Sequence, residues 1–259
     1  MEGILNGFKY FPQFDAMLSV SLLIFVRFFA FAKAAPVLSR KEIPTVIQLS
    51  FALIMTIIFV SVLKVEPLAA DFPLIIGMII NAAVGLFVGF IATSIFSAVT
   101  AGGDMINMQM GLSAAMMFDK STGSQSSLLG SYFNLVAAVI YINIGGIYWL
   151  IKAFERTFEI VPVTALSFSL QSIATPEYLI MITSSVLYVG LQVAAPILLA
   201  SLGQDIILGI ISRTAPQVNV FTLSFLFKPI LGAAIMIFIL PRFLDVITDY
   251  FEQYSFIFQ

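Results

Sequence analysis

The 259-residue sequence contains no histidine and no cysteine. It therefore has no disulfide, thiolate or imidazole, which excludes Ser-His and Cys-His catalysis and most zinc and haem sites. Charged residues are scarce, at 10% where a soluble domain has about 25%. Apolar residues make up 60% of the chain, and its mean hydropathy is +1.06. The composition predicts a membrane-associated protein rather than a water-soluble globule.

The sequence also lacks the residues typical of nucleic-acid-binding proteins, nucleotide-binding proteins and acid–base enzymes. The net charge of -2 lacks the excess of positive charge typical of proteins that bind nucleic acid. The sequence also contains no Gly-rich loop followed by Lys-Ser/Thr, the motif that binds nucleotide phosphates. Asp104 and Asp119 flank a Gly- and Met-rich stretch, where loop and cap roles are favoured over an acid pair. We therefore expect no enzymatic activity, no cofactor and no metal.

Long apolar runs account for most of the chain. About 20 residues suffice for a helix to cross the hydrocarbon core. Six runs approach or exceed this length, at residues 16–32, 46–63, 72–101, 128–151, 178–203 and 218–240. They predict an all-α, membrane-associated fold of about six long kinked helices in one integral domain, residues 1–259.

Several residues are unusual for simple lipid-facing spans. Arg27 falls within the first run, and a central Arg costs about 2.5–3.5 kcal/mol on insertion scales. Pro196, Pro229 and the Gly145-Gly146 pair are expected to break or bend their helices. Lysines and arginines in the loops favour neither side of the membrane. Two interpretations follow: kinked helices packed within one chain, or a subunit of a larger assembly.

Small residues recur every four positions on one face of the third run. They are Asn81, Gly85, Gly89, Thr93, Ser97 and Ala101. Such spacing, which includes a GxxxG match, lets a second helix backbone approach closely. The neighbouring helix could belong to this chain or to another subunit.

Methionines cluster between residues 101 and 127. They are Met105, Met108, Met110, Met116 and Met117. Their spacing fits an ordinary helical stripe in a core. Because methionine is flexible and polarizable, the cluster also fits an adaptable apolar seal.

The C-terminal segment has an amphipathic pattern. Asp245, Asp249 and Glu252 lie opposite an apolar face. That face consists of Phe243, Leu244, Ile247, Tyr250, Phe251 and Tyr254. The acidic side could meet solvent or lipid headgroups, or it could dock a partner.

Three runs resemble the FliR family of flagellar biosynthetic proteins. They are RFFAFAKAAPVLSRKEIP (residues 27–44), QMGLSAAMMFD (109–119) and SRTAPQVNVFTLSFLFK (212–228). The resemblance implies a core subunit of the type III export gate in the bacterial inner membrane, at the flagellar basal body. It implies FliP and FliQ as neighbours, FlhB and FlhA in the same apparatus, and unfolded proteins as substrates. It also implies a FliP-like part (residues 1–165) and a FliQ-like part (166–259).

The resemblance also implies two sets of functional residues. The pore plug would consist of Met110, Gly111, Ala114, Ala115, Met116, Met117, Phe118 and Asp119. Contacts with other subunits would be made by Arg27, Gly85, Gly89, Arg213, Pro216, Gln217, Asn219, Phe221 and Lys228. The chain departs from the family pattern at Lys120, where many relatives have proline, and at Ile147, where relatives often have histidine.

A second hypothesis is a self-sufficient secondary transporter of a small solute. Arg27, Asp205 and Lys228 would then bind the ion or substrate near broken helices. No convincing inverted repeat supports it.

Overall fold

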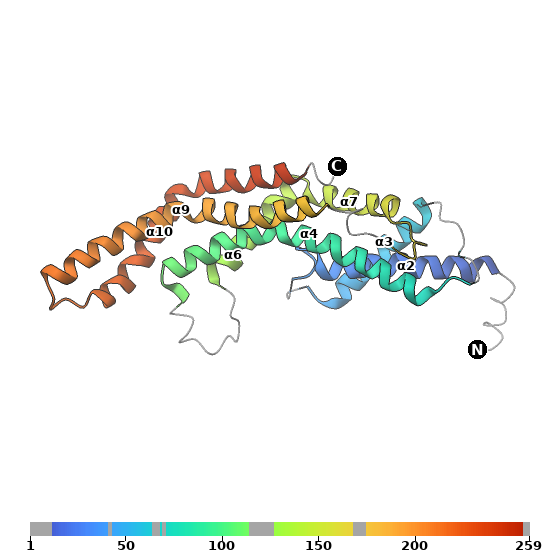
Figure 1. Ribbon diagram of the computed structural model, residues 1–259, viewed down its shortest axis with the longest axis horizontal. Helices are drawn as coiled ribbons and strands as arrows, with labels where there is room; N and C mark the ends of the chain where they lie inside the picture. Colours follow the sequence, from blue (N-terminus) through green and yellow to red (C-terminus); the bar gives the residue numbers. More distant parts are fainter. Residues whose placement is uncertain are drawn as a thin grey trace. The chain divides into compact units, whose positions relative to one another are not determined.

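The computed structural model describes residues 12–40, 43–63, 68, 71–113, 127–167 and 175–255. Within these ranges all regular structure is helical (Figure 1). The helices are α2 (Pro12–Ala34), α3 (Thr45–Val62), α4 (Leu74–Gln109), α6 (Leu128–Asn143), α7 (Gly146–Ile160), α9 (Pro176–Thr214) and α10 (Val220–Ser255). Five helices are long and apolar enough to cross a membrane, or six if the bent pair α6 and α7 is one span. The all-α prediction is confirmed.

The fourth apolar run forms two helices instead of one. α6 and α7 are bent by 77° at a short break. Gly145 adopts a φ of +83°, which L side chains rarely adopt. Gly146 lies against the Tyr141 ring, where an added Cβ would approach Cε2 to 2.4 Å. The predicted break at the glycine pair is therefore confirmed, whereas α9 and α10 continue through Pro196 and Pro229.

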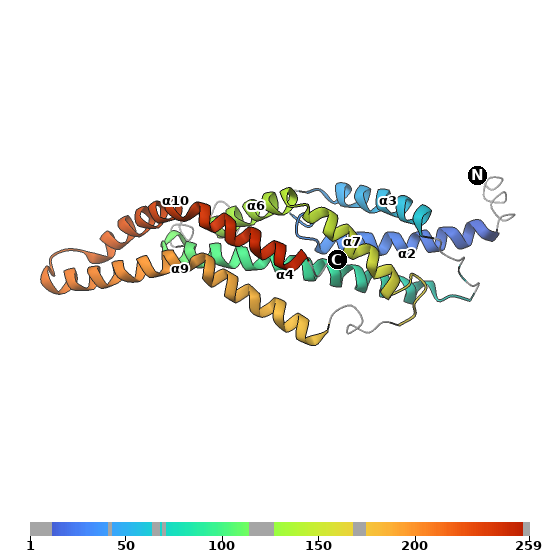
Figure 2. The same ribbon diagram turned by 90° about the horizontal axis from the view of Figure 1, so that it is seen from above.

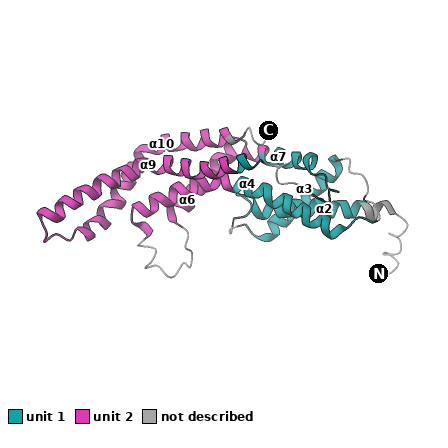
Figure 3. Ribbon diagram, in the orientation of Figure 1, with its two compact units in different colours: residues 1–93, 150–179 teal, residues 94–149, 180–259 magenta. Residues whose placement is uncertain are grey.

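The helices form two compact units, coloured separately in Figure 3. Unit 1 comprises residues 1–93 and 150–179, and unit 2 comprises residues 94–149 and 180–259. Each unit combines two separate stretches of chain. The predicted FliP-like part (residues 1–165) and FliQ-like part (166–259) were defined by resemblance to other proteins, whereas the two units are defined by contacts within the chain. The predicted division therefore stays a prediction.

Unit 1 has an aromatic core where α2 packs against α3 and α7. The ring of Phe28 lies 4.3 Å from Phe154 and 4.9 Å from Phe59, measured between centroids. The Phe158 ring lies 5.5 Å from that of Phe59. Tilted and edge-to-face rings at these separations are favourable beyond the area they bury. The phenylalanines therefore hold three helices together.

Unit 2 depends on close backbone approaches at glycines. A Cβ on Gly103 of α4 would lie 2.8 Å from the Cα of Gly130 in α6. A Cβ on Gly102 would lie 2.8 Å from Val193 Cγ1 in α9. Without side chains at these positions, α4 contacts α6 on one side and α9 on the other.

α9 and α10 follow each other as a hairpin, drawn in orange to red in Figure 2. The C-terminal part of α10 is amphipathic, as predicted. Phe243, Ile247, Tyr250 and Phe251 are buried, while Asp245, Asp249 and Glu252 are exposed. Leu244 departs from the expected apolar face because it is 36% exposed. The side chain of Tyr254 lies outside the described residues.

Candidate pore segment and assembly surface

The predicted pore segment begins where α4 ends. The N–H of Met110 donates to the Ile106 carbonyl at 2.9 Å, and that of Gly111 donates to the Met108 carbonyl at 3.1 Å. Gly111 has a φ of +72°, a left-handed conformation common after helix ends. Met110 is buried and packs on Gly232 of α10, whose added Cβ would approach Met110 Cγ to 2.6 Å. Met110 therefore belongs to the core of unit 2, and Gly111 turns the chain out of α4.

The remaining predicted plug residues lie outside the described residues. They are Ala114, Ala115, Met116, Met117, Phe118 and Asp119. The departure at Lys120 falls in the same undescribed stretch. Their roles stay predictions.

Both ends of that stretch are anchored in unit 2. Asn107 Nδ2 donates to Ser113 Oγ at 3.0 Å on the α4 side. Ser127 caps α6, since its Oγ accepts from the Gly130 N–H at 2.9 Å. Gly130 also lies against Gly103, so α4 and α6 touch next to these anchors. Ser113 and Ser127, the described residues on either side of this stretch, are therefore both held at the α4–α6 pair.

Arg27 is buried in unit 1, with no exposed side-chain surface. Its Nε donates to Asn81 Oδ1 at 2.8 Å, and its two terminal nitrogens donate to the carbonyls of Thr157 (3.1 Å) and Val161 (2.8 Å). These carbonyls lie at the C-terminal end of α7, where the helix dipole favours a cation. The Phe158 ring lies 4.4 Å from the guanidinium carbon. Arg27 thus joins three helices of one unit, a different role from the predicted contact with another subunit.

Gly85 and Gly89 lie against α2 within the same unit. A Cβ on Gly85 would meet the Arg27 carbonyl oxygen at 2.2 Å, and one on Gly89 would meet Ala34 Cβ at 2.5 Å. Thr93 Oγ1 continues the row with a hydrogen bond to the Ala34 carbonyl. The sequence left open whether the neighbouring helix belongs to this chain or to another subunit. The structure places a helix of the same chain beside Asn81, Gly85, Gly89 and Thr93.

The other predicted contact residues gather around the turn between α9 and α10. Asn219 Oδ1 accepts from the Thr222 N–H at 3.2 Å and caps α10. Arg213, Pro216 and Gln217 are exposed. They remain available to a partner, and their role as contacts stays a prediction.

Phe221 and Lys228 extend this region along α10. Phe221 is 71% exposed, with its ring 4.7 Å from that of Phe225. Lys228 Nζ lies 2.8 Å from Asp205 Oδ1 in α9, and the two side chains are 19% and 48% exposed. The ion pair joins the arms of the hairpin and satisfies the lysine within the chain.

These positions bear on the transporter hypothesis. Arg27 belongs to unit 1 and is enclosed by neutral partners, whereas Asp205 and Lys228 pair with each other in unit 2. Among the described residues, no group of three acidic side chains could hold a metal ion. Nothing in the part of the chain that the structure describes favours this hypothesis.

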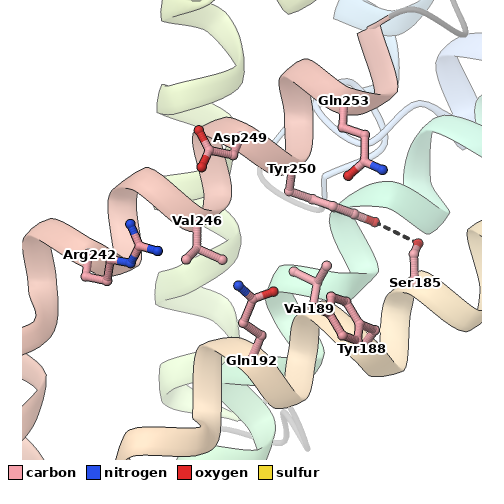
Figure 4. A pocket seen from close by; sticks show the side chains of 9 residues that line it. All are labelled: Ser185, Tyr188, Val189, Gln192, Arg242, Val246, Asp249, Tyr250 and Gln253. Carbon is pink, nitrogen blue, oxygen red and sulfur yellow. Dashed lines mark hydrogen bonds between the residues drawn. The ribbon is translucent and has the colours of Figure 1, made fainter.

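Sequence reasoning missed a polar pocket of about 320 Å³ between α9 and α10, shown in Figure 4. It is lined by Ser185, Tyr188, Val189, Gln192, Arg242, Val246, Asp249, Tyr250 and Gln253. The available signal was polar residues at helical spacing, since Ser185, Tyr188 and Gln192 share one face of a mostly apolar segment. Ile147, the other departure from the family pattern, lies in α7 and is 44% exposed.

Comparison with known proteins identifies the family. Residues 18–254 match the family described as bacterial export proteins, family 1. The chain is 26% identical to the flagellar biosynthetic protein FliR of Bacillus subtilis over 232 residues, 89% of this chain and 90% of that protein. It is 26% identical to FliR of Escherichia coli over 220 residues, 83% and 82% of the two chains. It is 30% identical to the surface presentation of antigens protein SpaR of Shigella flexneri over 174 residues, 67% and 63% of the two chains. Because the family match spans nearly the whole sequence, this chain belongs to the bacterial export proteins, family 1, together with the FliR proteins.

Proposed function

We propose that this chain is a core channel-forming subunit of the flagellar type III protein export gate. It assembles with FliP and FliQ subunits, beside FlhB and FlhA, in the bacterial inner membrane at the flagellar basal body. The family match and the FliR relatives, which align over most of their length, support this proposal. Helices long and apolar enough to cross a membrane are consistent with it.

The observation that carries the plug proposal is the close contact between α4 and α6, which we call the base of the plug. The Asn107–Ser113 bond, the Ser127 cap and the Gly103–Gly130 contact anchor both ends of one short stretch. That stretch contains the apolar sequence 114–118 followed by a polar sequence. In our proposal, residues 114–119 project from this base into the channel of the assembled gate.

The proposed mechanism is physical rather than catalytic. A narrow constriction lined by apolar side chains loses its water and stops conducting ions. Met116 and Met117 suit such a seal because thioether side chains adapt to different surfaces. An unfolded substrate displaces the plug, and the side chains close again behind it. Other components of the apparatus supply the energy.

Exposed apolar surface in unit 2 supports assembly with other subunits. α10 carries a row of exposed large side chains: Phe221, Phe225, Leu226, Phe227, Ile230, Leu231, Ile237 and Phe238. Contiguous exposed apolar surface marks an interaction site or a lipid-facing surface. We propose that Arg213, Pro216, Gln217, Asn219, Phe221 and Lys228 contact neighbouring subunits there. The enclosed Arg27, Gly85 and Gly89 support the fold of unit 1 instead.

Deletion of residues 114–118 tests the plug. We expect the complex with FliP and FliQ to form and the inner membrane to leak ions, measured with a potential-sensitive dye. Two variants of unchanged length serve as controls. Replacing Met116 and Met117 with serine should leak, because the seal becomes polar, whereas replacing both with leucine should not. An assembled complex without leakage in the deletion variant contradicts the plug, and failure of the wild-type chain to co-purify with FliP and FliQ contradicts the gate assignment.

A further inference from the structure

The pocket between α9 and α10 has no place in the proposed export mechanism. Its volume of about 320 Å³ falls within the range of small-molecule sites, about 300–1,000 Å³. Its floor contains the buried side chains of Val189 and Tyr250. Tyr250 Oη lies 3.3 Å from Ser185 Oγ and links the two helices, as Figure 4 shows. The pocket thus has a fixed floor within one compact unit.

Four polar side chains line the pocket. They are Gln192 of α9 and Arg242, Asp249 and Gln253 of α10. Within the described part of the chain, none of the four has a hydrogen bond or ion pair. Donors and acceptors are thus both available to a ligand.

The two charges are of opposite sign and stand apart. Arg242 and Asp249 are seven positions apart on α10, which places them about 10.5 Å apart along the helix axis. Both face the pocket (Figure 4), and among the described residues they form no ion pair with each other. A ligand with a positive and a negative group can therefore engage both, whereas a purely anionic ligand would also meet the Asp249 carboxylate.

The chemistry of the four side chains indicates which group of the ligand each of them would bind. Arg242 offers a planar guanidinium, which suits a phosphate, and the Gln192 amide can add a further donor. Asp249 offers a carboxylate for an ammonium group, and the Gln253 side-chain carbonyl can add an acceptor. A phosphate joined to a primary ammonium offers a group of matching chemistry to each of the four side chains.

The surroundings of the pocket suit a lipid. Leu187 and Leu191 are 61% and 50% exposed beside it on α9. Tyr188 lines the pocket and is 70% exposed, and tyrosine is enriched at headgroup level. The pocket also follows the apolar run 218–240, long enough to cross the hydrocarbon core. Acyl chains could therefore lie against apolar side chains while the headgroup fills the pocket.

We propose that this pocket binds the headgroup of a zwitterionic phospholipid of the phosphoethanolamine type. Arg242 and Gln192 bind the phosphate, and Asp249 and Gln253 bind the ammonium group. The acyl chains lie along Leu187 and Leu191 of α9. The proposal is independent of the export function, since it depends only on the geometry of α9 and α10.

Native mass spectrometry of the full-length protein tests the site. The protein, purified in detergent, is mixed with phosphatidylethanolamine, phosphatidylglycerol or phosphatidylcholine of identical acyl chains. We expect phosphatidylethanolamine to be retained at least about fivefold more than phosphatidylglycerol, since about 1 kcal/mol of preference corresponds to that ratio. Phosphatidylcholine should be retained less than phosphatidylethanolamine, because its methylated ammonium cannot donate hydrogen bonds to Asp249.

Two variants distinguish the pocket from general lipid adhesion. Arg242→Gln should lower retention of both phosphatidylethanolamine and phosphatidylglycerol. Asp249→Asn should abolish the preference for phosphatidylethanolamine and raise retention of phosphatidylglycerol. Arg156→Gln and Asp245→Asn are matched controls, since both residues are exposed and neither lines the pocket. Unchanged circular dichroism will show that each variant is folded.

Two results would overturn the proposal. The first is equal retention of the three lipids, or preferences that Arg242→Gln and Asp249→Asn do not change. The second is displacement of the lipid by soluble phosphoethanolamine at similar concentration, because the acyl chains would then contribute nothing. Motility is not a readout, so a negative result leaves the proposed export function unaffected.

Discussion

The Nε of Arg27 lies 2.8 Å from Oδ1 of Asn81, and both side chains are completely buried. Asn81 in turn donates to the carbonyls of Gly77 (2.8 Å) and Val163 (3.0 Å). The asparagine therefore accepts from the cation and fixes two backbone segments. An apolar segment can keep a guanidinium when neutral oxygens and a helix C-terminus surround it.

Asn81→Leu should destabilise unit 1. The substitution removes the acceptor of a buried charged donor, and we expect a loss of about 2–3 kcal/mol. Arg27→Met combined with Asn81→Leu should cost less than the sum of the two single variants, because they share one interaction. Thermal unfolding of the purified protein in detergent measures both effects. Additive effects would show that the two residues act separately.

Gly85→Ala should destabilise the contact between α2 and α4. The new Cβ would lie 2.2 Å from a backbone carbonyl oxygen, which cannot move aside as a side chain can. We expect a loss of about 1–3 kcal/mol from overpacking. Gly209→Ala is the matched control: an added Cβ there meets nothing within 4 Å, and alanine favours a helix by up to about 1 kcal/mol. Equal unfolding temperatures for the two variants would contradict the close approach.

Gly145→Ala should weaken the bend between α6 and α7. No atom lies within 4 Å of an added Cβ, so the expected cost, about 1–2 kcal/mol, comes only from the φ of +83°. Gly145→Asn should cost less than Gly145→Val, because asparagine tolerates this conformation better. Unfolding temperatures in the order Gly, Asn, Val support the backbone explanation. Any other order points to side-chain contacts.

Phe221→Ala should weaken assembly and leave the chain stable. The side chain is 71% exposed, so little burial is lost within the chain. Co-purification with FliP and FliQ measures assembly, and thermal unfolding of the isolated chain measures stability. Phe243→Ala is the contrasting variant, because Phe243 is buried and its loss should cost about 3–5 kcal/mol. Full co-purification of Phe221→Ala would remove this residue from the proposed interface.

Lys228→Gln separates two roles of this lysine. Its pair with Asp205 is partly exposed, so we expect at most about 1 kcal/mol of lost stability. If Lys228 also contacts a neighbouring subunit, co-purification should fall by more than this loss explains. Asp205→Asn removes the same ion pair and keeps the lysine, so it is the matched control. Equal effects of the two variants on assembly would assign Lys228 to the hairpin alone.

Local patterns predicted much of the fold. Each of the six apolar runs falls on a described helix, the fourth on both α6 and α7, and the Gly145-Gly146 pair located the bend between these two, because both signals act through nearby residues. The partners of Arg27 were not predictable, since Thr157 and Val161 are distant in sequence and contribute carbonyls that every residue has. The polar pocket was missed for a similar reason, because Gln192 and Arg242 become neighbours only when α9 and α10 pack.

The exposed face of α10 has a consequence for how the protein is made. Phe238 and Ile237 are 87% and 76% exposed, so a newly synthesised copy without neighbours presents aromatic and branched side chains over several turns. Such a copy is a substrate for proteases and a seed for aggregation. We therefore expect its cellular abundance to follow the supply of the subunits that cover this face, with surplus copies degraded soon after insertion.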